Sequence, residues 1–125
     1  MSPNRTILVV DDDDLTRSVI ELSLKSADYR VITAKGGNEA LELLQSHRAD
    51  LLLLDLMMPD ADGFDVIARV RKMSGCSDVP ILVLSARTSE GDTLAALKLG
   101  ASGYMLKPFR PDELLARVNK TLTGN

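Results

Sequence analysis

The chain has 125 residues, a length that suits one domain with a core buried on two sides. Apolar residues make up 45% of it and charged residues 26%, which is typical of globular domains and excludes disordered, collagen-like and disulfide-scaffold classes. Fifteen basic and eighteen acidic residues give a net charge of −3 without a long run of like charge, so we do not expect nucleic acid as a direct partner.

Predicted strands alternate with predicted helices along the chain. Three apolar runs lack polar alternation and indicate strands buried on both faces, and two runs are weaker strand candidates. In chain order the predicted strands are Ile7–Val10, Tyr29–Ala34, Leu51–Leu54, Ile81–Leu84 and Ser102–Leu106, the last with a Gly103 that suits a sheet edge. Apolar residues then recur at helical spacing after each strand: Leu15, Val19 and Leu22; Ala40, Leu41 and Leu44; Phe64, Ile67 and Val70; Leu94 and Leu97; Leu114, Leu115, Val118 and Leu122.

Turn and cap residues agree with this alternation. Gly100 is placed to end the fourth helix, and Pro111 with the acidic pair Asp112 and Glu113 suits the first turn of the fifth, although Arg110 is a poor N-cap. Right-handed crossovers fold five such units into a doubly wound, five-stranded parallel sheet. We therefore predict an α/β fold of the flavodoxin-like (βα)5 type, with strand order 2-1-3-4-5 and a ligand cleft at the carboxyl ends of strands 1 and 3.

The chain shows no membrane or disulfide signature. The aliphatic run Leu51–Leu54 is far shorter than the ~18 residues that a membrane span needs. The single cysteine, Cys76, has no intramolecular partner and no histidine near it in sequence, so neither a disulfide nor a catalytic thiol is expected. Together with the absence of a signal-like N-terminus, these features predict a cytoplasmic protein.

Polar and charged side chains stand at the carboxyl ends of the predicted strands. Asp11 and Asp12 follow the first strand, Asp55 the third, Ser85 the fourth and Lys107 the fifth. Because neighbouring strands lie ~4.8 Å apart, the expected strand order brings these residues to one rim of the sheet.

The chemistry of this group favours phosphoryl transfer. Three clustered carboxylates repel one another by on the order of 4 kcal/mol per pair at about 4 Å, so a cation is expected among them. Oxygen ligands favour Mg²⁺ over zinc. Lys107 supplies a positive charge, Ser85 a hydroxyl donor and Asp55 a nucleophilic carboxylate.

Each of these residues also has an ordinary structural explanation. A single Asp after a strand commonly forms a turn or caps a helix, and this is our interpretation of Asp13 and Asp14. The functional prediction therefore depends on the conjunction of several residues at one rim.

Four stretches of the sequence closely resemble the response-regulator receiver family. They are Ile7–Asp13, Asp55–Pro59 followed by Asp62 and Gly63, Leu84–Ala86, and Gly100–Phe109. They occur in the family's order and spacing and extend over essentially the whole chain. The resemblance implies one receiver domain over residues 1–125.

The resemblance implies a phosphoacceptor and a metal site. Asp55 is expected to accept the phosphoryl group and to contact Mg²⁺. Asp12 is expected to hold Mg²⁺ directly, Asp11 directly or through water, and the backbone carbonyl of Met57 is the further protein ligand.

The resemblance also implies a switch. Ser85 and Lys107 are expected to contact phosphoryl oxygens, and Tyr104 resembles the aromatic residue that changes rotamer when Ser85 moves. The Lys107–Pro108 peptide bond resembles the family's cis peptide.

Two further positions resemble those that flank the attacking water and set the phosphoryl lifetime. They are Met57 and Arg87, neither of which can act as a base, so slow self-dephosphorylation is expected.

The leading hypothesis is a two-component signalling switch rather than an enzyme with an external substrate. A histidine kinase or phosphotransfer protein donates the phosphoryl group, and the domain catalyses only its own phosphorylation and slow dephosphorylation. The surface of the fourth helix, fifth strand and fifth helix then binds an output domain, a downstream protein or a second copy.

Two alternatives belong to other classes. A hydrolase that uses Asp55 as its nucleophile would need a general acid nearby, typically an Asp two residues on, where this chain has Met57. A phosphorylation-independent pseudo-receiver binding module is disfavoured by the intact acidic pair, Ser85 and Lys107.

Overall fold

Strands and helices alternate along the chain in the computed structural model, which describes residues 5–86 and 90–123. The strands are β1 (Thr6–Val10), β2 (Arg30–Ala34), β3 (Leu51–Asp55), β4 (Ile81–Ser85) and β5 (Gly103–Leu106). The helices are α1 (Asp14–Ser26), α2 (Gly37–Ser46), α3 (Gly63–Lys72), α4 (Glu90–Leu99) and α5 (Pro111–Thr123).

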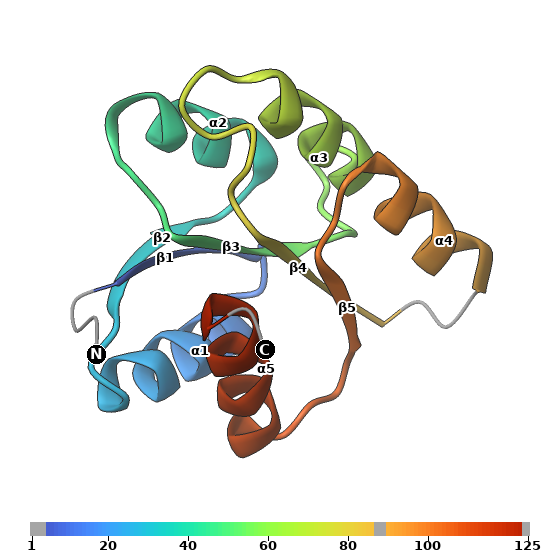
Figure 1. The fold of residues 1–125 in the computed structure, drawn as a ribbon. Coiled ribbons are helices and arrows are strands. Elements are labelled where there is room, and N and C mark those ends of the chain that lie inside the picture. The colour runs from blue at the N-terminus through green and yellow to red at the C-terminus, as the bar shows by residue number, and fades with distance from the viewer. Residues whose placement is uncertain (1–4, 87–89, 124–125) are drawn as a thin grey trace.

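All five strands are parallel and form one sheet in the order β2-β1-β3-β4-β5. Figure 1 shows α2, α3 and α4 over one face of this sheet and α1 and α5 over the other. The predicted doubly wound fold and strand order are confirmed. Two strands run one residue further than predicted, so that Asp55 and Ser85 are the last residues of β3 and β4.

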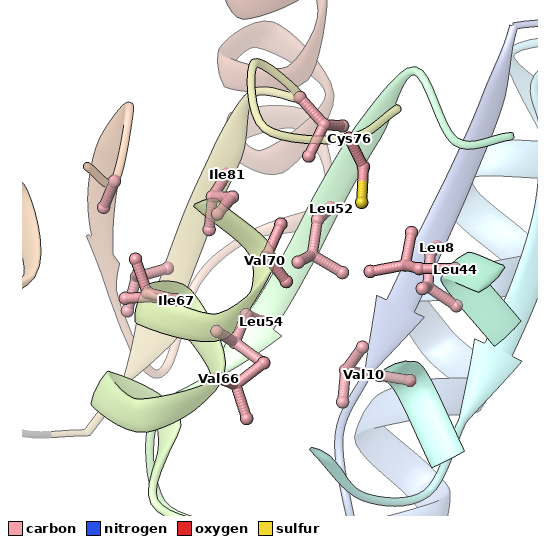
Figure 2. Packing of buried hydrophobic residues seen from close by; sticks show 14 of the residues in the cluster. Leu8, Val10, Leu44, Leu52, Leu54, Val66, Ile67, Val70, Cys76 and Ile81 are labelled. Atoms are coloured by element: carbon pink, nitrogen blue, oxygen red, sulfur yellow. The ribbon is translucent and has the colours of Figure 1, made fainter. Parts of the chain in front are cut away.

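The four consecutive leucines of β3 explain how one sheet supports two core layers. Successive side chains of a strand point to opposite faces. Leu52 and Leu54 accordingly pack in the cluster beneath α2, α3 and α4, whereas Leu51 and Leu53 pack in the cluster beneath α1 and α5. Figure 2 shows the first cluster, in which Val70 of α3 lies close to Leu52 of β3. Burial on both faces explains why these strands are unbroken apolar runs.

Aspartate side chains cap two of the helices that follow the strands, α1 and α3. Asp13 caps α1 by accepting the Thr16 N–H, and Asp62 caps α3 by accepting the Phe64 N–H. Gly100, at φ +114°, follows the last residue of α4 as predicted. The assignment of Asp13 to helix capping is therefore confirmed.

The apolar stripes that predicted α1 and α4 mostly face solvent. In α1, Ile20 and Leu24 are buried, while Leu15 and Leu22 are 74% and 73% exposed. In α4 the buried residue is Ala96. Helical spacing locates an apolar stripe but does not decide which stripe meets the sheet when a helix has two.

Within residues 5–86 and 90–123, no helix combines the length and apolar character that crossing a bilayer requires.

Candidate functional site

The turn after β1 brings two aspartates to the carboxyl rim of the sheet. Asp11 is 1% exposed and its N–H donates to the Ala34 carbonyl of β2, while Asp12 is exposed. Asp11 Oδ1 accepts the Asp13 N–H at 2.9 Å. The turn thus buries one carboxylate and leaves its neighbour open to solvent.

Asp55 lies beside this pair because β3 is hydrogen-bonded to β1. It is 5% exposed, and its Oδ1 accepts the Met57 N–H at 3.2 Å. One carboxylate oxygen from each of Asp11, Asp12 and Asp55 lies within 4.8 Å of the others. The three carboxylates predicted from strand ends therefore form one cluster.

Lys107 provides the positive charge of the cluster. Its Nζ lies 2.7 Å from Asp11 Oδ2 and 3.5 Å from Asp55 Oδ2. Its backbone N–H donates to the Ser85 carbonyl at 2.8 Å, which fixes the start of the turn after β5. The Lys107–Pro108 peptide bond is cis, as the resemblance implied.

The cluster shifts the pKa values of Asp55 and of Lys107, both upward. Burial raises the pKa of Asp55 to about 6, because desolvation outweighs the lowering by Lys107 and the Met57 N–H, and Asp11 and Asp12 raise it further. Burial alone would lower the pKa of Lys107, but its hydrogen bond to Asp11 and the charge of Asp55 raise it above the ordinary value. Lys107 is consequently a permanent cation beside carboxylates that repel one another.

An all-oxygen donor set of this kind fits a hard divalent cation. Mg²⁺ binds through a few carboxylates and retains several waters, and Asp12 and the exposed side of the turn leave room for water. No cysteine or histidine belongs to the cluster, so its chemistry does not match zinc.

Ser85 and Tyr104 lie on the same side of the sheet on adjacent strands. Tyr104 pairs with Val83, two residues before Ser85, and paired or alternate strand residues share a face. Ser85 is buried, and Tyr104 is partly buried against the cluster beneath α2, α3 and α4. The two side chains therefore lie on the same face of the sheet, on strands that are hydrogen-bonded to each other.

Of the two residues expected to set the phosphoryl lifetime, Met57 lies within the described residues. It follows Asp55 by two residues and is 52% exposed. Arg87 lies outside the described residues.

Sequence reasoning missed Arg17 as a residue of the site. Its guanidinium donates to the Asp11 carbonyl at 2.9 Å, its side chain is only 12% exposed, and it also pairs with Asp14. The available signal was its position on the same helical face as Ile20 and Leu24, where a charged residue needs a partner.

A sizeable hollow of the structure lies away from the cluster. It has a volume of about 830 Å³ and lies at the amino ends of the strands, next to the loops that precede β3 and β4. None of the predicted site residues lines it. Charge and donor chemistry, rather than volume, identify the candidate site.

A family model described as "Response regulator receiver domain" matches residues 7–119. The chain is 42% identical over 116 residues to "Probable transcriptional regulator ycf27" of Guillardia theta, covering 93% of this chain and 44% of that protein. It is 39% identical over 117 residues to "Transcriptional regulatory protein AfsQ1" of Streptomyces coelicolor, covering 94% of this chain and 51% of that protein. The chain thus spans about half the length of these curated relatives.

Solved structures agree with the observed fold. Chemotaxis protein CheY4 of Vibrio cholerae superposes with a TM-score of 0.91 at 35% identity, over 94% of this chain and 98% of that chain. A response regulator from Thermotoga maritima superposes with a TM-score of 0.86 at 32% identity, over 96% and 98% of the two chains.

Proposed function

Because this chain belongs to the response-regulator receiver domain family, we propose that it accepts a phosphoryl group on Asp55 in a Mg²⁺-dependent reaction and thereby switches a partner-binding surface. The observation that carries the proposal is the position of Asp55. Its carboxylate is almost fully buried at the end of β3, with two further carboxylates within 4.8 Å and Lys107 Nζ at 3.5 Å.

The proposed metal ligands are the carboxylates of Asp11, Asp12 and Asp55 and the backbone carbonyl of Met57. Asp12 would hold Mg²⁺ directly and Asp11 directly or through water. Bound Mg²⁺ would neutralise charge on the carboxylates and on the incoming phosphoryl oxygens.

Each residue of the site would have its own role in the transfer of the phosphoryl group to Asp55. An Asp55 carboxylate oxygen forms a bond to phosphorus while the bond from phosphorus to the imidazole nitrogen of a donor histidine breaks, and that nitrogen keeps the bonding electron pair. Lys107 and Ser85 would contact the phosphoryl oxygens. Arg17 donates to the Asp11 carbonyl and so holds the turn after β1 in place against the mutual repulsion of the carboxylates.

The switch would run from Ser85 to Tyr104. A Ser85 hydroxyl drawn toward a phosphoryl oxygen vacates space on the face of the sheet that Tyr104 shares. The surface of α4, β5 and α5 would respond, and Leu94, Leu97 and Leu106 already expose 42% or more of their area there.

The proposed partners are a histidine kinase or phosphotransfer protein and an output domain, downstream protein or second copy. The α4, β5 and α5 surface would serve the output partner or the second copy. On α1, the exposed residues Leu15, Val19 and Leu22 offer an apolar surface near the acidic turn for the phosphoryl donor. We further propose that residues 1–125 act as one receiver domain, in the cytoplasm, without direct contact to nucleic acid.

The phosphoryl lifetime is proposed to be long. Met57 offers only a thioether, and Arg87 offers donors alone, so neither orients an attacking water as a base would.

Incubation with acetyl phosphate and Mg²⁺ tests the proposal. Intact-mass measurement should detect one added phosphoryl group that survives acid and is lost in base. Asp55→Asn should remove the label, whereas Asp65→Asn, which changes a carboxylate on the outer surface of α3, should keep it. Unchanged labelling of Asp55→Asn would contradict the assignment, and an unlabelled parent chain would favour the pseudo-receiver alternative.

A further inference from the structure

We propose that Asp60 is a positioning residue for the metal site, because it ties the loop that carries Met57 to the start of α2. The proposal rests on the proposed function, in which the Met57 carbonyl is a Mg²⁺ ligand. Asp60 itself stands at the tip of the loop between β3 and α3, is exposed, and does not belong to the acidic cluster.

The first turn of α2 is capped by a residue of the loop between β3 and α3. Its N-cap residue, Gly36, has no side chain to accept a hydrogen bond. Instead Asp60 Oδ1 accepts the Gly37 N–H and Asp60 Oδ2 accepts the Asn38 N–H, both at 3.1 Å. A carboxylate more than twenty residues away thus satisfies two of the amides that a helix start leaves without partners.

The same loop is closed at its base. Met57 and Asp62 form an antiparallel bridge, and the Gly63 N–H donates to the Leu56 carbonyl at 3.1 Å. The Met57 N–H also donates to Asp55 Oδ1. The backbone at Met57 is therefore held by the bridge and by Asp55 on one side, while Asp60 holds the far end of the loop.

Two glycines allow the loop to approach α2 closely. A Cβ at Gly36 would lie 2.5 Å from Asp60 Oδ1, and a Cβ at Gly37 would lie 2.7 Å from Val66 Cγ2 and 2.8 Å from the Ala61 Cβ. Such distances force the neighbouring atoms to move. The contacts at Gly37 do not involve Asp60 and so add to the hydrogen bonds: they show that the start of α2 lies close both to the loop, at Ala61, and to α3, at Val66, on the face where α2 and α3 lie (Figure 1).

The contact couples the metal site to α2. Mg²⁺ bound at the Met57 carbonyl would restrict the loop, and a loop already restricted by Asp60 would lose less freedom on binding. Linkage makes the effect reciprocal, so Mg²⁺ should in turn strengthen the hydrogen bonds between Asp60 and the first turn of α2.

Calorimetric titration of the whole chain with MgCl₂ tests this coupling. Asp60→Ala should weaken Mg²⁺ binding roughly tenfold, the lower end of what is typical for residues that orient metal ligands. Asp60→Asn should weaken Mg²⁺ binding less than Asp60→Ala does, because its amide oxygen still accepts one N–H although its amide nitrogen cannot accept the other and the charge is gone. The comparison of the two variants separates hydrogen bonding from charge.

Glu39→Ala is the matched control. Glu39 Oε1 accepts the Lys35 N–H at 2.8 Å, so this variant also removes one carboxylate and one hydrogen bond at the start of α2, but nothing in the loop after β3. It should lower the melting temperature as Asp60→Ala does and leave Mg²⁺ affinity unchanged. Amide exchange supplies the reciprocal measurement: Mg²⁺ should slow exchange at Gly37 and Asn38 in the parent, in Asp60→Asn and in Glu39→Ala.

Three results would overturn the proposal while leaving the proposed function intact. The first is an Asp60→Ala variant that binds Mg²⁺ as tightly as the parent, and the second is a Glu39→Ala variant whose Mg²⁺ affinity falls as much as that of Asp60→Ala. The third is an Asp60→Asn variant whose Mg²⁺ affinity is as low as that of Asp60→Ala. A parent chain that does not bind Mg²⁺ would overturn both this proposal and the proposed metal site.

Discussion

Asp55 is a residue at which burial and neighbouring charge act in opposite directions. Its pKa of about 6, against an ordinary value of 3.8, means that desolvation and the repulsion of Asp11 and Asp12 exceed the attraction of Lys107. The metal-free protein therefore carries an ionised Asp55 at neutral pH at some cost in stability. The difference corresponds to at most about 3 kcal/mol.

Removing this charge should stabilise the metal-free protein in a pH-dependent way. The pKa of Asp55 is higher in the folded than in the unfolded state, so the folded state binds the proton more tightly. The resulting contribution to stability is fully present below pH 3.8 and is lost as the pH rises through about 6. Asp55→Asn should thus melt several degrees above the parent at pH 7.5, and the gap should shrink as the pH falls toward 4.5. Thermal melts in the presence of a chelator measure the gap, and a gap that does not vary with pH would refute this account.

At the scale of elements, a side chain of α3 holds the carboxyl end of α4. Ala96 is its buried residue, and Leu94 and Leu97 are partly or largely exposed. The Gly100 carbonyl accepts from Arg71 Nε and Nη2 at 3.1 and 2.6 Å, and Arg71 Nη1 donates to the carbonyls of Ser77 and Val79. One side chain of α3 therefore joins the loop before β4 to the end of α4.

Loss of this clamp should loosen α4. Arg71→Met keeps the aliphatic stem but leaves the carbonyls of Gly100 and Val79 without their charged donor, at a cost of about 2–3 kcal/mol. Denaturant unfolding should show the loss, and amide exchange should rise most at the carboxyl end of α4.

Arg69→Met is the control for this prediction. Arg69 lies on the same helix and pairs at 2.8 Å with Asp65, but both side chains are more than half exposed. Such a pair contributes about 0–1 kcal/mol. Equal destabilisation by the two variants would show that the carbonyl contacts of Arg71 are not important.

At the scale of the whole molecule, three carboxylates lie together at the carboxyl rim of the sheet, and contacts from several parts of the fold hold the turns that carry them. Lys107, the Arg17 contact to the Asp11 main chain and the Asp60 contact to α2 each restrain a turn that carries or adjoins the acidic cluster. A bound cation would act on all of these turns together.

Mg²⁺ should therefore raise the melting temperature in a saturable manner. At about 100 times its Kd the ligand contributes about 2.7 kcal/mol, or roughly 10 °C for a chain of this size. Asp12→Ala should abolish the dependence, and it should also stabilise the metal-free form because a like charge has gone. Scanning calorimetry over a MgCl₂ series measures both effects.

Glu42→Ala, which removes an exposed carboxylate on α2 away from the cluster, should keep the full response. Indifference of the parent chain to Mg²⁺, or loss of the response in Glu42→Ala, would contradict the metal site.

The alternation of elements, the strand order and the residues at the carboxyl rim all follow from the amino-acid sequence. Buried parallel strands need unbroken apolar runs, and the residue that follows each run must lie at the rim, so the sequence is sufficient to place Asp11, Asp55 and Lys107 together. These are consequences of local pattern and of the few topologies that right-handed crossovers allow.

The stripe of α1 that meets the sheet, and the bonds between distant groups, depend instead on tertiary packing. The contacts of Arg17 with Asp11, Asp60 with the start of α2, and Arg71 with Gly100 join segments that sequence spacing does not relate. Hydrogen-bond partners depend on how each helix packs on the sheet to within a few tenths of an ångström, and an apolar pattern gives the stripes of a helix without specifying that position.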